Sequence, residues 1–297
     1  MAIAKTVLLA GASGALGHKT GQALRAAGHV VRALVRTVPA GEPPVGLTWV
    51  RGDGFDLDSL HAACRGVDCV VSCMGAKVAM RLQGRAGYRD VDVPIHRNLL
   101  AAMRQAAVPA LVYVSAHHDA ELAPLPYFAA HRLVEELALA TPGLQVTVLR
   151  PTGLFSAFAG LLPLARLGAL PLFGDGTAKS NPIADADVAA LLVRAVAGEL
   201  SGIVPAGGPE ILSRAELLSC VLAAAGRRPR LLRVPASWIR LALRLGHPLH
   251  PRLCELVEFA LAVSLHDCVA PMHGSQTLSG YLGSTQRPTA PGVRQRA

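Results

Sequence analysis

The feature that most constrains the fold of this chain is a glycine-rich loop between a short apolar strand and a helix. The strand is predicted over residues 6–10, the loop GASGALG occupies residues 11–17, and the helical pattern runs from about residue 15 to residue 27. Gly11 allows a tight turn off the strand, Gly14 lets the backbone approach a ligand closely, and Gly17 lets the helix pack against the strand. The free N–H groups and positive dipole end of the helix then favour a phosphate.

The first 150 residues continue this alternation of strand and helix. Further strands are predicted at 30–35, 48–51, 68–73, 110–115 and 145–149, and further helices at 57–64, 93–107 and 125–141. The strand at 68–73 carries an apolar run, as a strand buried on both faces of a parallel sheet requires. The alternation predicts a doubly wound parallel α/β sheet of the Rossmann type.

After residue 150 the pattern changes and helices dominate. They are predicted at 156–167, 185–197, 214–225, 237–245 and 252–264. We therefore expect a Rossmann domain over residues 1–150 and a smaller, mostly helical substrate lobe over residues 151–283, packed on the C-terminal edge of the sheet. Residues 284–297 are polar and contain proline and glycine, which predicts a flexible tail.

The composition excludes several classes of protein. Hydrophobic residues make up 52% and charged residues 16%, so the chain is not disordered. The most apolar stretch, residues 151–174, carries Arg166 and three prolines, which argues against a transmembrane helix. No signal-peptide pattern is present, and the six cysteines form no C-x-x-C pair, so reduced thiols and a cytoplasmic location are expected.

The net charge of +9 is concentrated near the C-terminus. Seven arginines and no acid lie between Arg227 and Arg252, interleaved with apolar residues, which resembles an amphipathic helix with arginines on one face. We interpret the segment as a solvated face or a partner interface, and peripheral contact of residues 227–252 with an acidic membrane stays open. No DNA-binding motif accompanies the charge, so nucleic acid is not an expected partner. The oligomeric state is left open.

The glycine loop in this setting predicts a dinucleotide cofactor. Its expected ligands are Gly11, Ser13, Gly14, Ala15, Leu16 and Gly17. Nineteen residues after Gly17, at the end of the second strand, stands Arg36 where an NAD-binding fold usually has an acid for the ribose 2′-hydroxyl. A guanidinium suits a 2′-phosphate, and the Ser13 hydroxyl adds a donor, so NADP(H) is favoured over NAD(H). The alternative for Arg36 is an exposed strand-end charge, compatible with either cofactor.

Three further strand ends offer cofactor contacts. Asp53 follows the third strand, where it could bond the adenine amino group or only its own backbone. Met74 and Gly75 end the fourth strand, where a small residue lets the backbone lie along the ribose. Pro151 and Thr152 follow the sixth strand, where the backbone would lie against the nicotinamide, although a proline also simply ends a strand.

Together these motifs resemble the atypical short-chain dehydrogenase/reductase family, in particular its NmrA-like and divinyl-chlorophyllide-reductase-like NAD(P)H-binding branch. The resemblance covers most of residues 5–225. It rests on the stretches VLLAGASGALG, VRALVR, VRGDGFDLDSL, VDCVVSCMG, NLLAAMRQAAVPALVYVSA, VLRPTGLFS, FGDGTAKSNPIADADVA and GGPEILSRAEL. It implies NADP(H), a C-terminal substrate lobe and a pocket between that lobe and the edge of the sheet. Members include reductases of small cyclic or aromatic substrates and proteins that only sense the nicotinamide redox state.

The resemblance also implies catalytic residues. The usual set is a serine after strand five and Tyr-x-x-x-Lys on the next helix, which here correspond to Ser115, Tyr127 and, in place of the lysine, His131. A phenol with a pKa near ~10 needs a neighbouring cation to exchange protons at neutral pH. A histidine with a pKa of about 6.5 is mostly neutral there. Tyr127 and His131 are therefore either proton-transfer residues or a pair that merely faces a pocket or solvent.

We expect an NADP(H)-dependent oxidoreductase that transfers a hydride to or from a carbonyl or activated alkene of a small apolar substrate. His117, Phe155 and Phe158 are candidate substrate contacts, and no metal-ligand spacing is present. The alternatives are a non-catalytic NmrA-like NADP(H) sensor that regulates a partner, which the missing lysine favours, and an accessory subunit that holds the nucleotide as a structural element. The substrate and the reaction direction are not encoded in any motif.

Overall fold

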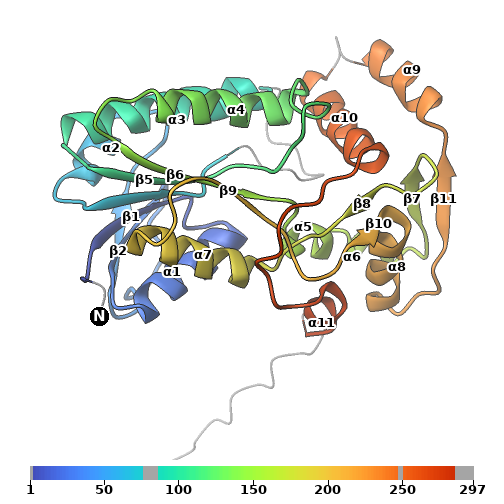
Figure 1. Cartoon of the computed structure of the whole chain (residues 1–297), viewed down its shortest axis with the longest axis horizontal. Coiled ribbons are helices and arrows are strands. Elements are labelled where there is room, and N and C mark those ends of the chain that lie inside the picture. The colour runs from blue at the N-terminus through green and yellow to red at the C-terminus, as the bar shows by residue number, and fades with distance from the viewer. Residues whose placement is uncertain (1–2, 76–85, 247–249, 285–297) are drawn as a thin grey trace, which may run out of the picture.

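The computed structural model describes residues 3–75, 86–246 and 250–284. Its main element is a sheet of seven parallel strands in the order β3-β2-β1-β4-β5-β6-β9 (Figure 1). The strands are β1 (Thr6–Ala10), β2 (Val30–Val35), β3 (Leu47–Arg51), β4 (Cys69–Ser72), β5 (Ala110–Val114), β6 (Gln145–Pro151) and β9 (Gly202–Ala206). The predicted doubly wound parallel sheet is confirmed.

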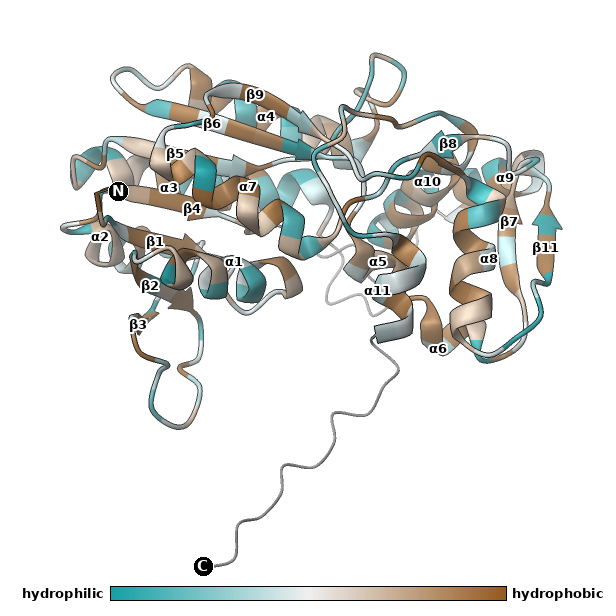
Figure 2. Cartoon of the chain, turned by 60° about the horizontal axis from the view of Figure 1, so that its bottom comes forward, coloured by the Kyte–Doolittle hydropathy of each residue, from teal (hydrophilic) through white to brown (hydrophobic). Residues whose placement is uncertain are grey.

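Helices cover both faces of this sheet. One face carries α1 (Ala15–Ala26) and α7 (Asp185–Ala197), and the other carries α2 (Leu57–Cys64), α3 (Tyr88–Gln105) and α4 (Pro126–Leu139) (Figure 1). Strand β1 shows why the central strands must be apolar throughout. Val7 and Leu9 belong to the core under α1 and α7, whereas Leu8 and Ala10 belong to the core on the opposite face. Most of its length is accordingly hydrophobic (Figure 2).

The strand order reverses between β1 and β4. Strand β1 leads on to β2 on one side, while β4 pairs with its other side. A doubly wound sheet opens a crevice outside the carboxyl ends of its strands at such a switch point. The glycine loop leaves β1 at this position, so the fold places the predicted phosphate-binding segment where ligands bind in this class of sheet.

The C-terminal part of the chain forms a smaller lobe beside the sheet. Its helices are α5 (Phe155–Ala159), α6 (Leu162–Ala165), α8 (Arg214–Ala224), α9 (Ala236–Gly246), α10 (Pro251–Leu265) and α11 (Leu278–Ser284). Its strands are β7 (Leu170–Phe173), β8 (Lys179–Ser180), β10 (Leu212–Ser213) and β11 (Leu231–Val234), which form two small pairs, β8 with β10 and β7 with β11. The predicted helical C-terminal region is therefore present, and it has its own apolar core.

The chain returns to the sheet once after residue 150. Helix α7 packs against α1, and β9 extends the sheet by pairing with β6. Val188, Leu191 and Leu192 of α7 are buried in the same core as strand β1, which explains the return. The expected division at residue 150 therefore does not coincide with the end of the sheet, which reaches Ala206. Of the expected tail, Ser284 ends α11 and residues 285–297 lie outside the described residues.

Two expected helices differ in the structure. The single helix predicted over 156–167 is two short helices, α5 and α6, separated at Gly160. The arginine-rich segment is not one helix, because residues 227–252 form a turn, β11, α9 and the start of α10, with residues 247–249 outside the described part. Arg252 is buried, with its guanidinium carbon 3.7 Å from the centre of the Tyr88 ring. That arginine does not belong to a solvated face. No described helix is long and apolar enough to span a bilayer.

Candidate cofactor and active site

The glycine loop has the close approaches that its sequence predicts at two of three positions. Gly11 has φ +83, and a Cβ there would lie 2.6 Å from the carbonyl carbon of Cys73, which follows β4. A Cβ on Gly17 would lie 2.1 Å from the Gly11 carbonyl oxygen. Gly14 is different, because its Cβ would meet only that same oxygen at 3.4 Å. The fold therefore needs glycine at 11 and 17, while Gly14 leaves the outer side of the loop open.

Helix α1 presents its N-terminus to this loop. Its first turn contains no acid, and the residue before it, Gly14, has no side chain to cap the free N–H groups. The helix therefore supplies no acid of its own to compensate its dipole at the position where a pyrophosphate is expected. Gly11 and Gly14 are held together by a hydrogen bond in which the Gly14 N–H donates to the Gly11 carbonyl at 3.1 Å. The loop is preformed to accept an anion.

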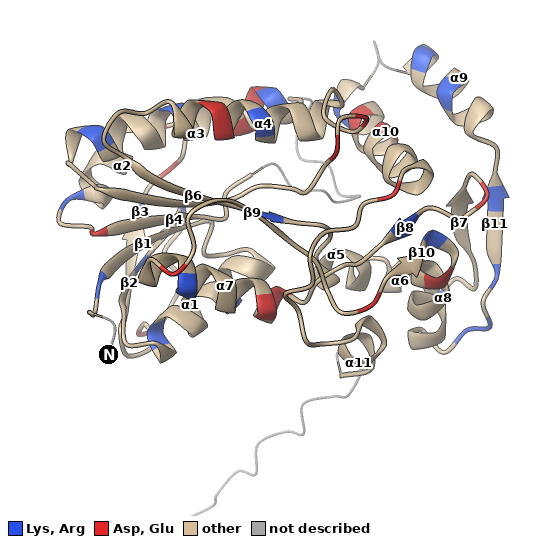
Figure 3. Ribbon diagram, viewed as in Figure 1, with Lys and Arg blue, Asp and Glu red and all other residues tan. Residues whose placement is uncertain are grey.

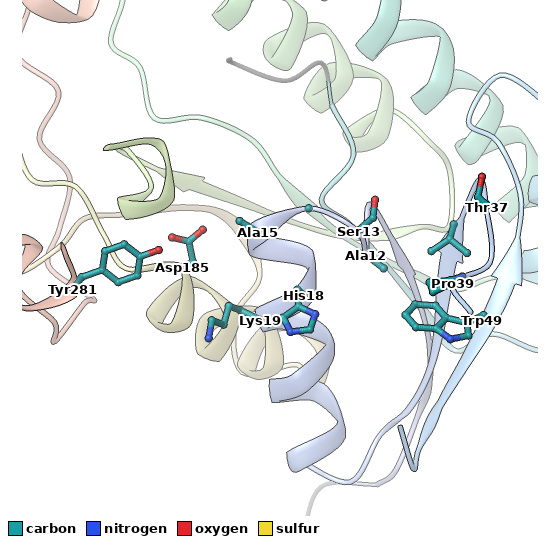
Figure 4. Close-up of a pocket in the computed structure, with 12 residues that line it drawn as sticks. Ala12, Ser13, Ala15, His18, Lys19, Thr37, Pro39, Trp49, Asp185 and Tyr281 are labelled. Atoms are coloured by element: carbon teal, nitrogen blue, oxygen red, sulfur yellow. The ribbon is translucent and has the colours of Figure 1, made fainter. Parts of the chain in front are cut away.

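A cavity of about 440 Å³ opens beside the loop (Figure 4). Its volume is in the usual range for small-molecule sites. Its lining comes from the loop, the first turns of α1, the ends of β2 and β3, α7 and α11. The lining residues are Ala12, Ser13, Gly14, Ala15, His18, Lys19, Val35, Thr37, Pro39, Trp49, Asp185 and Tyr281. Ser13, Gly14 and Ala15 were predicted from the loop, whereas the residues from the other elements were not.

The charges around this cavity are unevenly distributed. Lys19 lines it, and Arg36 is exposed directly beyond β2 between the lining residues Val35 and Thr37. Asp185 is the acid among the lining residues, and Figure 4 places it at the Tyr281 end, away from Thr37. Its carboxylate accepts hydrogen bonds from the Ser156 N–H at 3.0 Å and the Ser156 hydroxyl at 2.6 Å. The end of the cavity near β2 therefore has Arg36 beside it and no acid among its lining residues, whereas Lys19 lies toward Asp185.

The other predicted cofactor residues lie along the same edge of the sheet. The Asp53 carboxylate accepts the N–H of Phe55 at 3.0 Å, which is the local turn contact. Gly75 lies over Asp92, with its Cβ position 3.7 Å from a carboxylate oxygen. Thr152 donates its hydroxyl to the Asn181 carbonyl at 2.6 Å. Pro151 ends β6, and Met74 is half-buried just after β4. Whether these residues contact a cofactor stays a prediction.

Ser115 is joined to a buried ion pair. It follows β5, is 4% exposed, and its hydroxyl donates to the Glu135 carboxylate. Glu135 in turn accepts from the Nε of Arg150 at 2.9 Å. The Ser115 proton is therefore directed into the Glu135–Arg150 pair and not toward Tyr127. The pair joins α4 to the end of β6, and the Ser115 hydroxyl connects the end of β5 to it.

Tyr127 and His131 contact each other, as their spacing on α4 predicts. Their rings meet edge to face with centres 4.7 Å apart. His131 is 7% exposed, and its Nδ1 is 2.7 Å from the hydroxyl of Tyr113 on β5. Burial, with smaller contributions from His96 and His118, lowers the pKa of His131 to about 3. His131 is therefore neutral at pH 7 and does not replace the charge of a lysine.

Tyr127 lies in an aromatic environment that keeps its phenol protonated. Its ring meets Phe259 of α10 at 4.5 Å and Tyr88 of α3 at 5.0 Å. Burial, then the nearby Asp92, Tyr88 and Cys268, raise the pKa of Tyr127 well above its ordinary value. Among the described residues none forms a hydrogen bond with its hydroxyl. The phenol can donate a proton to a strong base such as an alkoxide, and it is a poor base itself.

Sequence reasoning missed the contribution of α10 to this region. The Arg252 guanidinium stacks on the Tyr88 ring, and the Glu255 carboxylate accepts the Tyr88 N–H at 2.9 Å. Together with Phe259, these residues close the site from the lobe side. The charge run had indicated a surface for Arg252, and its burial follows from the aromatic face that Tyr88 provides. No pattern in the local sequence predicts the contact between Arg252 and Tyr88.

The predicted substrate residues occupy different places. The Nε2 of His117 donates to the Val269 carbonyl at 3.1 Å, and burial lowers the pKa of this ring. Phe155 is 1% exposed and lies in the core of the lobe, 5.4 Å from the ring of Tyr281. Phe158 is half-buried on α5. No group of three metal-ligating side chains is present within residues 3–75, 86–246 and 250–284.

A parallel sheet with a glycine loop at its switch point defines a dinucleotide-binding protein of the Rossmann class. The sequence profile of the NAD(P)H-binding family matches residues 11–199, and the chain belongs to that family. This confirms the resemblance to the NAD(P)H-binding branch of the atypical short-chain dehydrogenases/reductases.

Relatives with known names differ in their chemistry. The divinyl chlorophyllide a 8-vinyl-reductase of Oryza sativa subsp. indica is 28% identical over 275 residues, 80% of this chain and 64% of the relative. An epimerase family protein of Mycobacterium bovis is 30% identical over 259 residues, 80% of this chain and 84% of the relative. The chain spans only 47% of a mitochondrial NADH dehydrogenase subunit of Arabidopsis thaliana that it also matches.

The fold is shared with solved structures. A nucleoside-diphosphate-sugar epimerase from Staphylococcus aureus superimposes with a TM-score of 0.73 at 19% identity, covering 94% of this chain and 99% of the other. At that identity the likeness concerns the fold. The comparisons therefore support an oxidoreductase-like NAD(P)H-binding protein and leave the substrate and the choice of nucleotide to be tested.

Proposed function

We propose that this protein is an NADP(H)-dependent reductase that acts on a carbonyl or activated alkene of a small apolar substrate. The observation that carries the proposal is the cavity beside the glycine loop, whose β2 end has the exposed Arg36 next to it and no acid among its lining residues. An anionic 2′-phosphate is favoured there over a bare hydroxyl. The reductase of Oryza sativa, which acts on a vinyl group by its name, is consistent with the alkene option.

The cofactor residues divide the binding task. The α1 N-terminus and the loop, with Gly14 at its open side, would hold the pyrophosphate, and Ser13 and Arg36 would hold the 2′-phosphate. When bound, the nicotinamide supplies the hydride. The chain's own task is then to orient the substrate and exclude water, and the packed rings of Tyr88, Tyr127 and Phe259 between the sheet edge and α10 suit both.

Tyr127 is the proposed proton donor. Reduction of a carbonyl leaves negative charge on oxygen, and a phenol whose pKa is raised by burial is fully protonated and ready to donate at pH 7. The reverse reaction needs a phenolate. His131 is neutral, and no cation among the described residues is placed to stabilise a negative charge on the Tyr127 oxygen. The arrangement favours reduction over oxidation. Hydride transfer itself requires no side-chain nucleophile.

Binding and turnover of the nucleotide test the proposal directly. The protein is titrated with NADPH and NADH, and quinones, enones and ketones are then added while nicotinamide fluorescence is followed. Arg36→Glu should weaken NADPH binding at least about tenfold and leave NADH binding nearly unchanged. Arg104→Glu, an exposed arginine on α3, is the matched control. Equal losses for both nucleotides would remove Arg36 from 2′-phosphate recognition.

A second candidate function is an NADP(H) sensor that performs no chemistry. It is favoured by the burial of His131 against Tyr113 and by the engagement of Ser115 with Glu135, which leave Tyr127 without the usual activating partners. Turnover separates the two. Oxidation of bound NADPH by one acceptor class, lost in Tyr127→Phe with NADPH affinity retained, supports the reductase. Tight binding with no oxidation by any acceptor supports the sensor.

A further inference from the structure

Helix α9 projects from the end of the lobe that is far from the sheet (Figure 1). It packs on α10, and within α9 only Ile239 is buried. Trp238, Leu241 and Leu245 are 75%, 60% and 70% exposed. Large apolar side chains are found singly on most protein surfaces, but three on one short helix are unusual enough to require an explanation.

The spacing of the residues on α9 gives the helix three distinct faces. Trp238, Leu241 and Leu245 are three and four residues apart, so they form one continuous apolar stripe. Ile239 and the half-buried Leu243 are four apart and face the lobe. Arg240 and Arg244, both exposed and also four apart, form the third face. We call the apolar stripe with its two flanking arginines the α9 face.

The surroundings of the α9 face are strongly basic. No Asp or Glu occurs in the sequence between Glu216 and Glu255. Arg227, Arg228, Arg230 and Arg233, on β11 and the turn before it, are all exposed, and they continue the positive charge along the same end of the molecule (Figure 3). Asp175 is an acid close to Arg233: hydrogen bonds from Thr177 lower the pKa of its carboxyl, and Arg233 lowers it slightly further. The other arginines add to a positive field.

We propose that the α9 face is a docking surface for an anionic lipid bilayer. An apolar stripe with a tryptophan, flanked by arginines on a helix that lies along the surface, is the pattern that inserts into the headgroup boundary of a membrane. Nucleic acid would engage the arginines but leaves the leucine stripe in water. The complementarity of charge selects anionic over neutral lipid, because each arginine near such a surface strengthens binding by about fivefold.

This inference is independent of the proposed function, because the α9 face lies outside the cofactor cavity and none of its residues lines it. Docking through α9 would leave the glycine loop and its cavity accessible. The inference predicts membrane association whether or not the protein turns over NADPH.

The test uses the full chain and two kinds of vesicle, phosphatidylcholine alone and phosphatidylcholine mixed with phosphatidylglycerol. In a Trp49→Phe background, Trp238 is the remaining tryptophan, so its emission reports insertion. We expect co-sedimentation with the anionic vesicles and a blue shift of Trp238, both decreasing as salt screens the charges. Arg240→Gln with Arg244→Gln should weaken binding roughly 25-fold. Trp238→Ser with Leu241→Ser should weaken it at least about tenfold.

Matched variants on other surfaces control for charge and folding. Arg97→Gln with Arg104→Gln removes two exposed arginines of α3, and Leu139→Ser removes an exposed leucine of α4, and both should bind vesicles like the parent protein. NADPH binding confirms that each variant is folded. Equal binding to neutral vesicles, or no binding to either, overturns the proposal. So does a dimer in light scattering that Leu241→Ser dissociates, or binding to a soluble polyanion with no vesicle binding.

Discussion

At the glycine loop, single residues separate what the fold requires from what a ligand requires. A Cβ at Gly17 would collide with the Gly11 carbonyl oxygen at 2.1 Å, whereas one at Gly14 would be at 3.4 Å from that atom. At Gly17, α1 packs tightly on the turn after β1. At Gly14, a side chain would extend into the open side of the loop. The two positions therefore predict different defects for the same substitution.

We expect Gly14→Ala to fold normally and to lose NADPH affinity by about tenfold or more, because its methyl group would stand where the pyrophosphate must approach. Gly17→Ala should lower the free energy of unfolding by about 2 kcal/mol or more, since backbone must shift to relieve the clash. Urea denaturation and nucleotide titration of both variants measure the two effects. Unaltered affinity in Gly14→Ala would contradict the placement of the pyrophosphate.

Two of the buried histidines, His96 and His131, predict how stability depends on pH. Burial lowers the pKa of His96 to about 4 and that of His131 to about 3, from 6.5. Below pH 6.5 the unfolded chain takes up protons that the folded chain does not, so stability is full above pH 6.5 and falls as the pH decreases toward 4. Each histidine contributes a slope of up to about 1.4 kcal/mol per pH unit.

In His131→Gln, whose amide can still bond Tyr113, this slope should decrease by about that amount, and His18→Gln, on the exposed surface of α1, should leave it unchanged. Urea denaturation at a series of pH values between neutrality and the acid limit gives the slopes. A parent-like slope in His131→Gln would mean that the imidazole is protonated in the folded protein. That result would restore the cation next to Tyr127 which the structure lacks.

At the scale of elements, prediction from sequence succeeded where local patterns are complete. Helix α7 was predicted with its observed bounds, because its apolar residues recur at helical spacing and Gly198 ends it with φ +85. The glycine loop carries its own signature. The split between α5 and α6 depends on Gly160, which is tolerated inside many helices. The short strand β9 has no clear alternation in its sequence, so it could not be assigned to the sheet. Only its pairing with β6 in the structure shows that it belongs there.

The part of the site that lies in one continuous motif could be predicted from the sequence, and the part that comes from distant elements could not. Ser13, Gly14 and Ala15 belong to a motif that is continuous in sequence, and they line the cavity. Asp185 and Tyr281 reach the same cavity from α7 and α11, far away in sequence, and only the packed structure brings them there. Arg252 is an example of the opposite error. The run of arginines predicts that it lies on the surface, but its contact with the Tyr88 ring buries it.

Helix α10 stabilises the first turn of α3 through Glu255. The Glu255 carboxylate accepts the N–H of Tyr88, the first residue of α3, and lies at the positive end of that helix. Glu255→Ala should therefore lower the free energy of unfolding by about 1–2 kcal/mol. The exposed Glu136, paired with Arg132 on α4, is the control, and Glu136→Ala should cost at most about 0.5 kcal/mol. Similar losses in urea denaturation would mean that α10 does not stabilise α3.

At the scale of the whole molecule, the cavity joins the two parts of the chain. One wall is the glycine loop and α1 of the sheet domain, and the other includes Tyr281 of α11, which packs on Phe155 in the core of the lobe (Figure 4). A ligand that fills the cavity must touch both. Binding should therefore stabilise the lobe together with the loop.

We expect NADPH at about 100 times its dissociation constant to stabilise the protein by about 2.7 kcal/mol. In hydrogen exchange, the amides of the glycine loop and of α11 (Leu278–Ser284) should both become protected, while those of α9, on the far side of the lobe, should not change. Tyr281→Phe keeps the ring against Phe155 and serves as the control for packing, and Tyr281→Ala should lose the protection of α11 alone. Protection confined to residues 11–17 would show that the nucleotide contacts only the sheet domain and that α11 closes no part of its site.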